Sequence, residues 1–252
     1  MSTGDHKIFD VNRAESVSQF LEDFKLPYEK WEEVLKAIER GYGNADTSDE
    51  IGDFALSYCT NVCDDPVLMR VIIDSKDLYL ALCYCVSMYP NPEVRQMILD
   101  SKDPIVASEY CEEVEDDAGM RQVIIDSKNT EASKNYLIYV DPDNLEMRQI
   151  LLEAKNPSYA YQYCLVRNDP DMRQIVVDGK NPELAFSYCV EIGNDNEMRQ
   201  IILDARDPEW AYMYICHMSE ELDEDMLQVI IDSGDPEWTS RLYALFGDYH
   251  LF

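Results

Sequence analysis

Residues 198–208 read MRQIILDARDP, and residues 94–104 read VRQMILDSKDP, so one pattern occurs twice in the chain. Seven acidic residues mark the copies of this pattern: Asp74, Asp100, Asp126, Glu153, Asp178, Asp204 and Asp232. They are separated by 26, 26, 27, 25, 26 and 28 residues. A period this regular is typical of a repeat protein.

The first half of each copy predicts a short helix. Apolar residues fall at i, i+3, i+4 and i+5, as in Met120, Val123, Ile124 and Ile125. This spacing places them on one side of a helix, although so many Ile and Val residues could also form a short buried strand.

The second half argues against strands. An Asp or Asn stands before a Pro, as in Asp103-Pro104, which is typical of a helix N-cap followed by the first helical position. Behind this cap, Ala107, Tyr110, Cys111 and Val114 fall at i, i+3, i+4 and i+7 and share one helix face. Each copy therefore predicts an αα-hairpin.

A hairpin of about 26 residues cannot bury both faces alone, so its copies must stack. We therefore expect an all-α fold, a right-handed α-solenoid of about seven αα-hairpin repeats of 25–28 residues. Residues 1–49 predict an N-terminal helical cap and loop, with amphipathic helices at 13–25 and 28–40. Residues 50–252 predict the repeat array and its C-terminal cap.

A turn Asp/Asn-Pro followed by an aliphatic-Arg pair recurs at residues 91–95 (NPEVR) and 169–173 (DPDMR). This feature resembles HEAT-like arrays and, more closely, the leucine-rich-repeat-variant type of short helical repeat. The resemblance covers roughly residues 50–246. It implies an all-α superhelix used for binding, and no chemistry.

Cysteine and tyrosine each occupy a fixed repeat position. Five of the eight cysteines share a position at which other copies carry Leu137, Ile215 and Tyr243, which indicates buried, reduced thiols rather than metal ligands. Seven tyrosines share the preceding position, which predicts core side chains whose hydroxyls reach a groove or a backbone partner. These tyrosines are Tyr58, Tyr84, Tyr110, Tyr136, Tyr163, Tyr188 and Tyr214.

The three histidines are scattered and no nucleophile, phosphate-loop or metal motif occurs. We therefore predict no enzyme activity, no cofactor and no metal site.

The basic residues are few and periodic. One row holds Arg95, Arg121, Arg148, Arg173 and Arg199. A second row holds Lys76, Lys102, Lys128, Lys155, Lys180 and Arg206. A repeated Arg beside a repeated Asp predicts a ladder of ion pairs between neighbouring hairpins in preference to a phosphate-binding stripe.

Overall charge limits the choice of partner. The chain has 51 acidic residues against 21 Lys and Arg, a formal charge of −30. This charge repels phosphate backbones and anionic lipids, so we expect no direct binding of nucleic acid and no membrane association. No apolar run is long enough for a membrane span, and the first residues lack a signal region, so a cytoplasmic location is predicted.

The surplus acid gathers on the loops that join one hairpin to the next. In a solenoid these loops would line up along one edge, on the order of 50 Å long. The candidate partner-binding residues on it are Glu115, Asp116, Asp117, Asp141, Asp143, Asp169, Asp171, Asp195 and Glu197. A merely solvated surface is an equally open interpretation of this charge.

Our functional prediction is a non-enzymatic acidic protein that engages a basic protein surface. Its sharpest version is a nucleic-acid mimic that inhibits a DNA- or RNA-binding protein or a defence complex. The alternative is a structural or adaptor scaffold that binds a helix or peptide in the solenoid groove through an aromatic row at Tyr161, Phe186 and Tyr212. Packing between repeats is the competing interpretation of these three rings.

Overall fold

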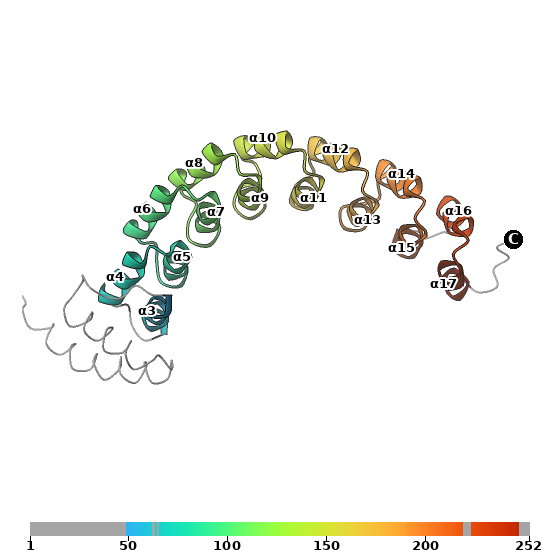
Figure 1. Cartoon of the computed structure of the whole chain (residues 1–252). Coiled ribbons are helices and arrows are strands. Elements are labelled where there is room, and N and C mark those ends of the chain that lie inside the picture. The colour runs from blue at the N-terminus through green and yellow to red at the C-terminus, as the bar shows by residue number, and fades with distance from the viewer. Residues whose placement is uncertain (1–48, 62–63, 65, 219–222, 247–252) are drawn as a thin grey trace, which may run out of the picture. The chain divides into compact units, whose positions relative to one another are not determined.

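The computed structural model describes residues 49–61, 64, 66–218 and 223–246. Within these ranges every regular element is an α-helix, so the predicted all-α class is confirmed (Figure 1). The Ile- and Val-rich stretches form helices and not strands. The cap helices predicted at 13–25 and 28–40 lie outside the described residues.

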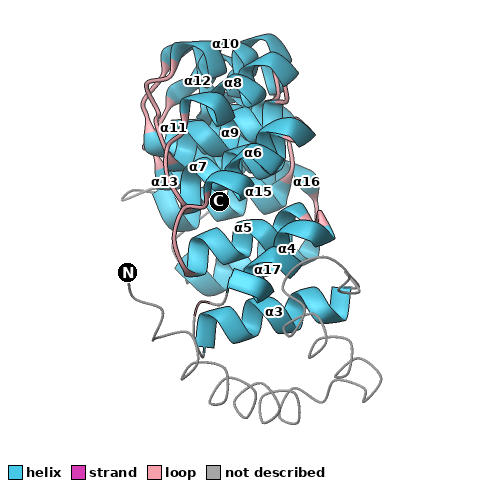
Figure 2. Ribbon diagram, turned by 90° about the vertical axis from the view of Figure 1, so that its left-hand side faces the viewer, coloured by secondary structure: helices cyan, strands magenta, loops and turns pink. Residues whose placement is uncertain are grey.

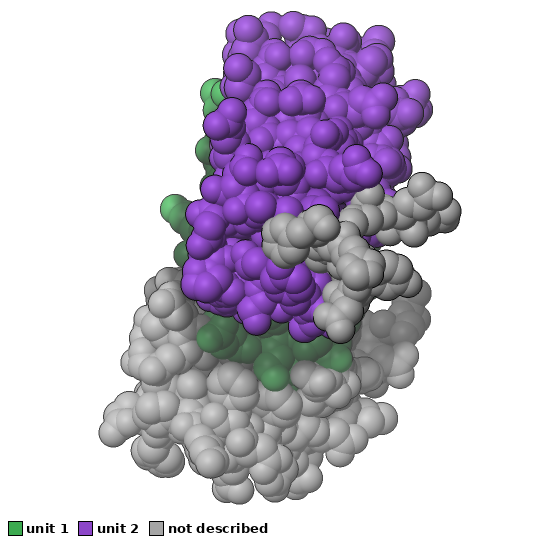
Figure 3. All heavy atoms as spheres, turned by 90° about the vertical axis from the view of Figure 1, so that its right-hand side faces the viewer, with its two compact units in different colours: residues 1–127 green, residues 128–252 purple. Residues whose placement is uncertain are grey.

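The chain divides into two compact units, residues 1–127 (unit 1) and residues 128–252 (unit 2) (Figure 3). The described helices of unit 1 are α3 (Asp49–Asn61), α4 (Pro66–Ser75), α5 (Leu78–Ser87), α6 (Pro92–Ser101), α7 (Pro104–Glu113) and α8 (Ala118–Ser127). Those of unit 2 are α9 (Thr130–Tyr139), α10 (Leu145–Ala154), α11 (Pro157–Val166), α12 (Pro170–Gly179), α13 (Pro182–Glu191), α14 (Asn196–Ala205), α15 (Pro208–Met218), α16 (Glu224–Ser233) and α17 (Pro236–Phe246).

Helices alternate between two layers in each unit (Figure 1). The first layer contains α4, α6 and α8 in unit 1, and α10, α12, α14 and α16 in unit 2. The second layer contains α3, α5 and α7 in unit 1, and α9, α11, α13, α15 and α17 in unit 2. Helices pack on neighbours in the same layer, as α11 does on α13 and α12 on α14, and on a partner in the other layer, as α11 does on α12, which is the packing of a helical repeat array.

The packed hairpin differs from the predicted one in its phase. Second-layer helices pack extensively on the first-layer helix that follows them, as α7 does on α8 and α11 on α12. Helices joined by a two-residue turn, such as α6 and α7, touch only slightly, because Lys102 and Asp103 bring little more than their ends together. The described chain contains seven packed pairs followed by α17, which agrees with about seven repeats. The right-handed sense stays a prediction.

The second-layer helices begin as their caps predict. The Asp103 carboxylate accepts hydrogen bonds from the backbone N–H groups of Ile105 and Val106, with Pro104 at the first helical position. Asn156 caps α11 in the same way. These bonds satisfy amide groups that a helix start otherwise leaves unpaired.

First-layer helices end on a residue in the left-handed backbone conformation. Its φ lies between 48° and 59° at six positions that carry no glycine: Lys76, Lys102, Lys128, Lys155, Lys180 and Arg206. All six side chains are exposed, and none takes part in an ion pair within the described ranges. This basic row therefore terminates the first-layer helices.

The core lies between the layers. In the α11–α12 pair it consists of Ala160, Tyr163 and Cys164 against Met172 and Val176, all at most 3% exposed. The repeated alanine is buried in other pairs too, as at Ala107 and Ala185. In α17 the same face is closed by Leu242, while Tyr243 is 42% exposed.

Candidate partner-binding edge

Within each unit, the loops that join second-layer to first-layer helices lie at the same end of the helix pairs (Figure 2). We call this the loop edge. In unit 1 it includes residues 114–117, and in unit 2 it includes residues 140–144, 167–169 and 192–195, together with the first turn of the helix that follows each loop. The candidate carboxylates lie on it, whereas the two-residue turns lie at the other ends of the helices.

A repeated ion pair organises the loop edge of unit 2. The Arg148 guanidinium donates from Nε and Nη2 to the two oxygens of Asp169, at 2.6 and 2.9 Å. Its Nη2 also donates to Asp171 at 2.6 Å. Arg148 belongs to α10, Asp169 caps α12 and Asp171 lies in the first turn of α12, so this three-residue rung joins neighbouring first-layer helices.

Two further rungs repeat the geometry. Arg173 binds Asp195 with both N···O distances at 2.7 Å, and also binds Glu197 at 2.6 Å. Arg199 binds Asp223 at 2.7 and 2.8 Å and Asp225 at 2.7 Å. In unit 1, Arg95 holds Asp117 at 2.7 and 2.9 Å. The ladder predicted between neighbouring hairpins is therefore confirmed for Arg95, Arg148, Arg173 and Arg199. The fork of donors on arginine matches the two carboxylate oxygens.

The repeated acidic residue is not the main partner of these arginines. It accepts a hydrogen bond from the Gln four residues earlier on the same helix, as Asp178 does from Gln174 at 2.9 Å and Asp204 from Gln200 at 2.8 Å. Arginine instead reaches the N-cap Asp of the next first-layer helix, 21 to 24 residues further along the chain. The sequence signal for this pairing is the nearly constant separation between each Arg and the cap Asp of the next first-layer helix.

Each cap aspartate has two roles. Asp195 accepts from the backbone N–H groups of Glu197 and Met198, at 2.9 and 3.2 Å, while it binds Arg173. The Arg173 hydrogen bond and these amides lower the pKa of Asp195 despite its burial. For Asp169, burial favours the neutral acid, but hydrogen bonds from Arg148 and the cap amides outweigh it and lower its pKa. These carboxylates are held in the charged form.

Exceptions to the ladder follow the identity of the cap. Asn91 caps α6, and the preceding first-layer helix presents Met69 at the Arg position, with 3.2 Å between Asn91 Nδ2 and the Met69 sulfur. Arg121 of α8 binds Asp116, on the loop that precedes its own helix. An amide cap thus replaces the carboxylate where Met69 replaces arginine.

The ladder divides the carboxylates of each rung into two kinds. The inner ones are shielded, with side-chain exposures of 7% for Asp169, 19% for Asp195 and 14% for Asp223. The outer ones are open, at 64% for Asp171, 58% for Glu197 and 70% for Asp225. One arginine faces two carboxylates, so each rung retains one net negative charge. A partner can reach the outer carboxylates and not Asp169.

The remaining candidate carboxylates lie on the loops themselves. Asp117 binds Arg95 and is 14% exposed, whereas Asp116 is 40% exposed. Asp143 is 63% exposed and pairs with Arg167. The backbone N–H of Asp143 donates a hydrogen bond to the Asp141 carboxylate. Glu115 is exposed and receives a weak bond from Tyr110, at 3.4 Å.

Buried tyrosines fix the loops in place. All seven of the predicted row are buried, and the hydroxyls of Tyr84, Tyr110, Tyr163 and Tyr214 donate to loop groups. Tyr163 donates to the Pro142 carbonyl at 2.6 Å and Tyr214 to Asn194 at 2.7 Å. In unit 1, Tyr84 donates to Asp64 at 2.8 Å. The hydroxyl partners are therefore loop groups, some backbone and some side chain.

The cysteine row is buried as predicted, at Cys59, Cys85, Cys111, Cys164 and Cys189. The Cys164 thiol lies 4.0 Å from the Asp169 carbonyl, and burial raises its pKa to about 11. It is thus a neutral core group at neutral pH. Cys83 and Cys216 occupy other positions and are exposed.

The aromatic row packs between consecutive second-layer helices. Phe186 is 9% exposed, and its ring centroid lies 5.7 Å from that of Trp210. Tyr212 meets Trp238 at 5.5 Å, and Lys134 lies 5.3 Å from the Tyr159 ring, so one pair of positions recurs. Tyr161 donates its hydroxyl to Glu191 at 2.9 Å. These contacts favour the packing interpretation of the row.

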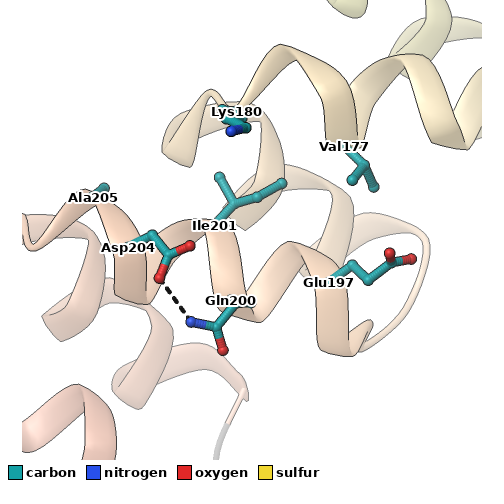
Figure 4. A pocket seen from close by; sticks show the side chains of 7 residues that line it. All are labelled: Val177, Lys180, Glu197, Gln200, Ile201, Asp204 and Ala205. Carbon is teal, nitrogen blue, oxygen red and sulfur yellow. Dashed lines mark hydrogen bonds between the residues drawn. The ribbon is translucent and has the colours of Figure 1, made fainter.

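A hollow of about 360 Å³ lies in the first layer between α12 and α14 (Figure 4). Val177 and Ile201 supply its apolar wall, and Lys180, Glu197, Gln200 and Asp204 supply its polar groups. Gln200 already donates to Asp204, and Glu197 already binds Arg173, so these polar groups serve the layer.

Within the described ranges, no group of three or more His, Cys, Asp or Glu residues is placed to hold a metal ion. No described helix is long and apolar enough to cross a membrane. No protein-family model matches this chain, and neither a curated protein nor a solved structure is found to be similar to it. The fold and the loop edge thus carry the functional inference.

Proposed function

We propose that this chain is a non-enzymatic binding protein that engages a basic surface of a partner protein through its loop edge. The supporting observation is the row of outer carboxylates at Asp171, Glu197 and Asp225, each at least 58% exposed. They stand at equivalent positions on α12, α14 and α16 and are held in place by the rungs. Fixed charges of one sign attract a cationic surface over a long range.

The sharper form of the proposal is a nucleic-acid mimic that occupies the binding groove of a DNA- or RNA-binding protein. Packed helices lie roughly 8–10 Å apart, so the rungs alone present one net charge in that distance. Duplex DNA carries one charge per about 1.7 Å of axis. The mimic therefore needs the loop carboxylates of unit 2, such as Asp141 and Asp143, to add to the outer row.

Three substitutions test the loop edge. The variant D171N/E197Q/D225N removes the outer charges, and we expect it to capture basic partners from a lysate much more weakly than the parent chain. Capture by the parent chain should fall between about 0.05 and 0.5 M salt because the interaction is electrostatic. Partners are identified by mass spectrometry, and duplex DNA is added as a competitor.

The matched control is D178N/D204N/D232N, which removes one exposed carboxylate from the other end of each of the same three helices. It should retain capture. Partners of acidic or neutral character, or equal losses in the two variants, would contradict the proposal. If the captured partners are basic but DNA does not displace them, the nucleic-acid mimic is contradicted and binding of a basic surface still stands.

We also propose that the array belongs with the leucine-rich-repeat-variant type of helical repeat and that it acts in the cytoplasm. The support is the Asp/Asn-Pro turn with its aliphatic-Arg pair, as at residues 169–173, and the unpaired thiols of the cysteine row.

A further inference from the structure

The second-layer helices of unit 2 carry two parallel stripes. The apolar stripe contains Ile138, Leu165, Val190 and Cys216, at one position of α9, α11, α13 and α15. The acidic stripe contains Glu131, Glu183, Glu209 and Glu237, at one position of α9, α13, α15 and α17. Neither stripe was singled out by the repeat pattern, because both positions vary along the chain.

The two positions lie on the helix face opposite the core. They are seven residues apart, which is nearly two full turns, so they share one face. The buried positions of α13, such as Ala185 and Tyr188, lie on the other side. The stripes therefore face away from the first layer.

Both stripes are accessible. Leu165 is 45% exposed and Val190 is 44% exposed, while Ile138 is half-buried. Glu131, Glu183 and Glu209 are exposed and form no ion pair within the described residues, whereas Glu237 binds Arg241 at 2.8 Å. This surface thus combines unburied apolar area with uncompensated negative charge.

The dimensions of the surface select its occupant. Seven residues of helix separate the stripes by about 10 Å, which is close to the 10–12 Å diameter of an α-helix. With neighbouring helices roughly 8–10 Å apart, the stripes cross α9 to α15 over about 25–30 Å. A helix of about 18 residues has that length.

We propose that this face of unit 2 binds an amphipathic, lysine- or arginine-rich helix of a partner protein. Its apolar side would cover Leu165 and Val190, and its cationic side chains would reach Glu183 and Glu209. The inference rests on the proposed function in one respect, the basic character of the partner, and it adds the surface and the shape of the bound segment.

Unit 1 lacks this pattern. In α7 the order is reversed, with Ile105 at the position of the acidic stripe and Glu112 at that of the apolar stripe. In α5 both positions are apolar, at Tyr79 and Val86. The site therefore belongs to unit 2, and Val86, which is 44% exposed, offers a matched control.

The probe is a synthetic 18-residue peptide with leucines on one helical face and lysines on the other, and binding is measured by calorimetry with the full chain. A scrambled peptide of the same composition is the second probe. We expect the amphipathic peptide to bind roughly tenfold more tightly than the scrambled one, because only it can bury its apolar side while its charges are paired.

Two stripe variants locate the contact. L165S/V190S and E183Q/E209Q should each weaken binding of the amphipathic peptide by roughly tenfold or more. The control V86S changes an equivalent exposed residue of unit 1, and the control E153Q/D178N changes two first-layer carboxylates of unit 2. Each control should change the affinity by less than about twofold. Circular dichroism checks that every variant is folded.

Equal binding of the two peptides, or unchanged affinity in both stripe variants, would overturn the helix site. If D171N/E197Q/D225N then weakens binding, the loop edge alone holds the basic partner and the proposed function stands. If the parent chain binds neither cationic peptide, both proposals fail.

Discussion

Six residues in the left-handed conformation close the first-layer helices, and all six are Lys or Arg. This conformation costs an L-residue other than glycine roughly 1–2 kcal/mol. Glycine takes the position only at Gly234, with φ of 64°. A cation there lies beside the unpaired carbonyls at the negative end of the helix dipole, which offsets part of the cost.

Replacing Lys180 by glycine should therefore stabilise the fold. The strain energy removed from the folded state is larger than the stabilisation of the unfolded state by the extra conformational entropy of glycine. We therefore expect the free energy of unfolding to increase by about 0.5 kcal/mol. Urea denaturation measures it.

The reverse change, G234K, is the control and should destabilise by a similar amount. A lower urea midpoint for K180G would show that the lysine side chain contributes more than the strain removes.

The sequence predicts the start of these helices better than their end. The Asp-Pro and Asn-Pro pairs are local chemistry, and Asp103 and Asn156 cap their helices as expected. Lysine has no preference for the left-handed region, so nothing in the sequence indicated the backbone conformation at Lys102 and Lys180.

At the scale of the helix pair, the rungs are the main polar connection between neighbouring first-layer helices. The Arg148 rung links α10 to α12 with three hydrogen bonds, and Asp169 is largely shielded from water. A shielded carboxylate that loses its partner costs more than an exposed one.

R148A should accordingly lower the free energy of unfolding by about 2 kcal/mol. The control R167A removes an arginine whose pair with Asp143 is exposed on both sides, and it should cost less than about 1 kcal/mol. Urea unfolding of both variants gives the comparison.

Binding of a basic partner should not weaken in R148A, because Asp171 keeps its charge and gains exposure. Equal stability of R148A and the parent chain, together with lost binding, would mean that the arginine serves the partner and not the ladder.

The sequence did not predict which two consecutive helices pack as a hairpin, nor which carboxylate each arginine binds. Periodicity shows which residues share a position but not which neighbouring helix packs on which, and the extensive contact of α11 with α12 arises only in three dimensions. The pairing of Arg173 with Asp195 spans 22 residues, so no local rule connects them.

For the whole molecule, the charge of −30 sets how stability responds to acid. Repulsion among the carboxylates opposes the compact state at neutral pH. The cap residues Asp117, Asp169, Asp195 and Asp223 behave differently, because their pKa values are lowered in the folded chain.

A folded-state pKa below the unfolded value of about 3.9 contributes stability above that pH, and the contribution is lost as pH falls through the folded value. We therefore expect the melting temperature to fall steeply below about pH 4. Thermal unfolding followed from pH 7 to 2 tests this.

D195N removes one of these carboxylates and should show a shallower fall on the acid side. An identical acid limb in the variant and the parent chain would mean that the caps do not control acid unfolding.

The shared cap aspartate also governs how such a chain can lengthen during evolution. An in-frame duplication of residues 173–198 would carry Arg173 and Asp195 together, so every arginine would again meet a carboxylate at the next boundary. A duplication that placed Met69 before an aspartate cap would strand a shielded charge. Gain or loss of a period between Arg148 and Asp223 therefore leaves every shielded cap carboxylate with its arginine.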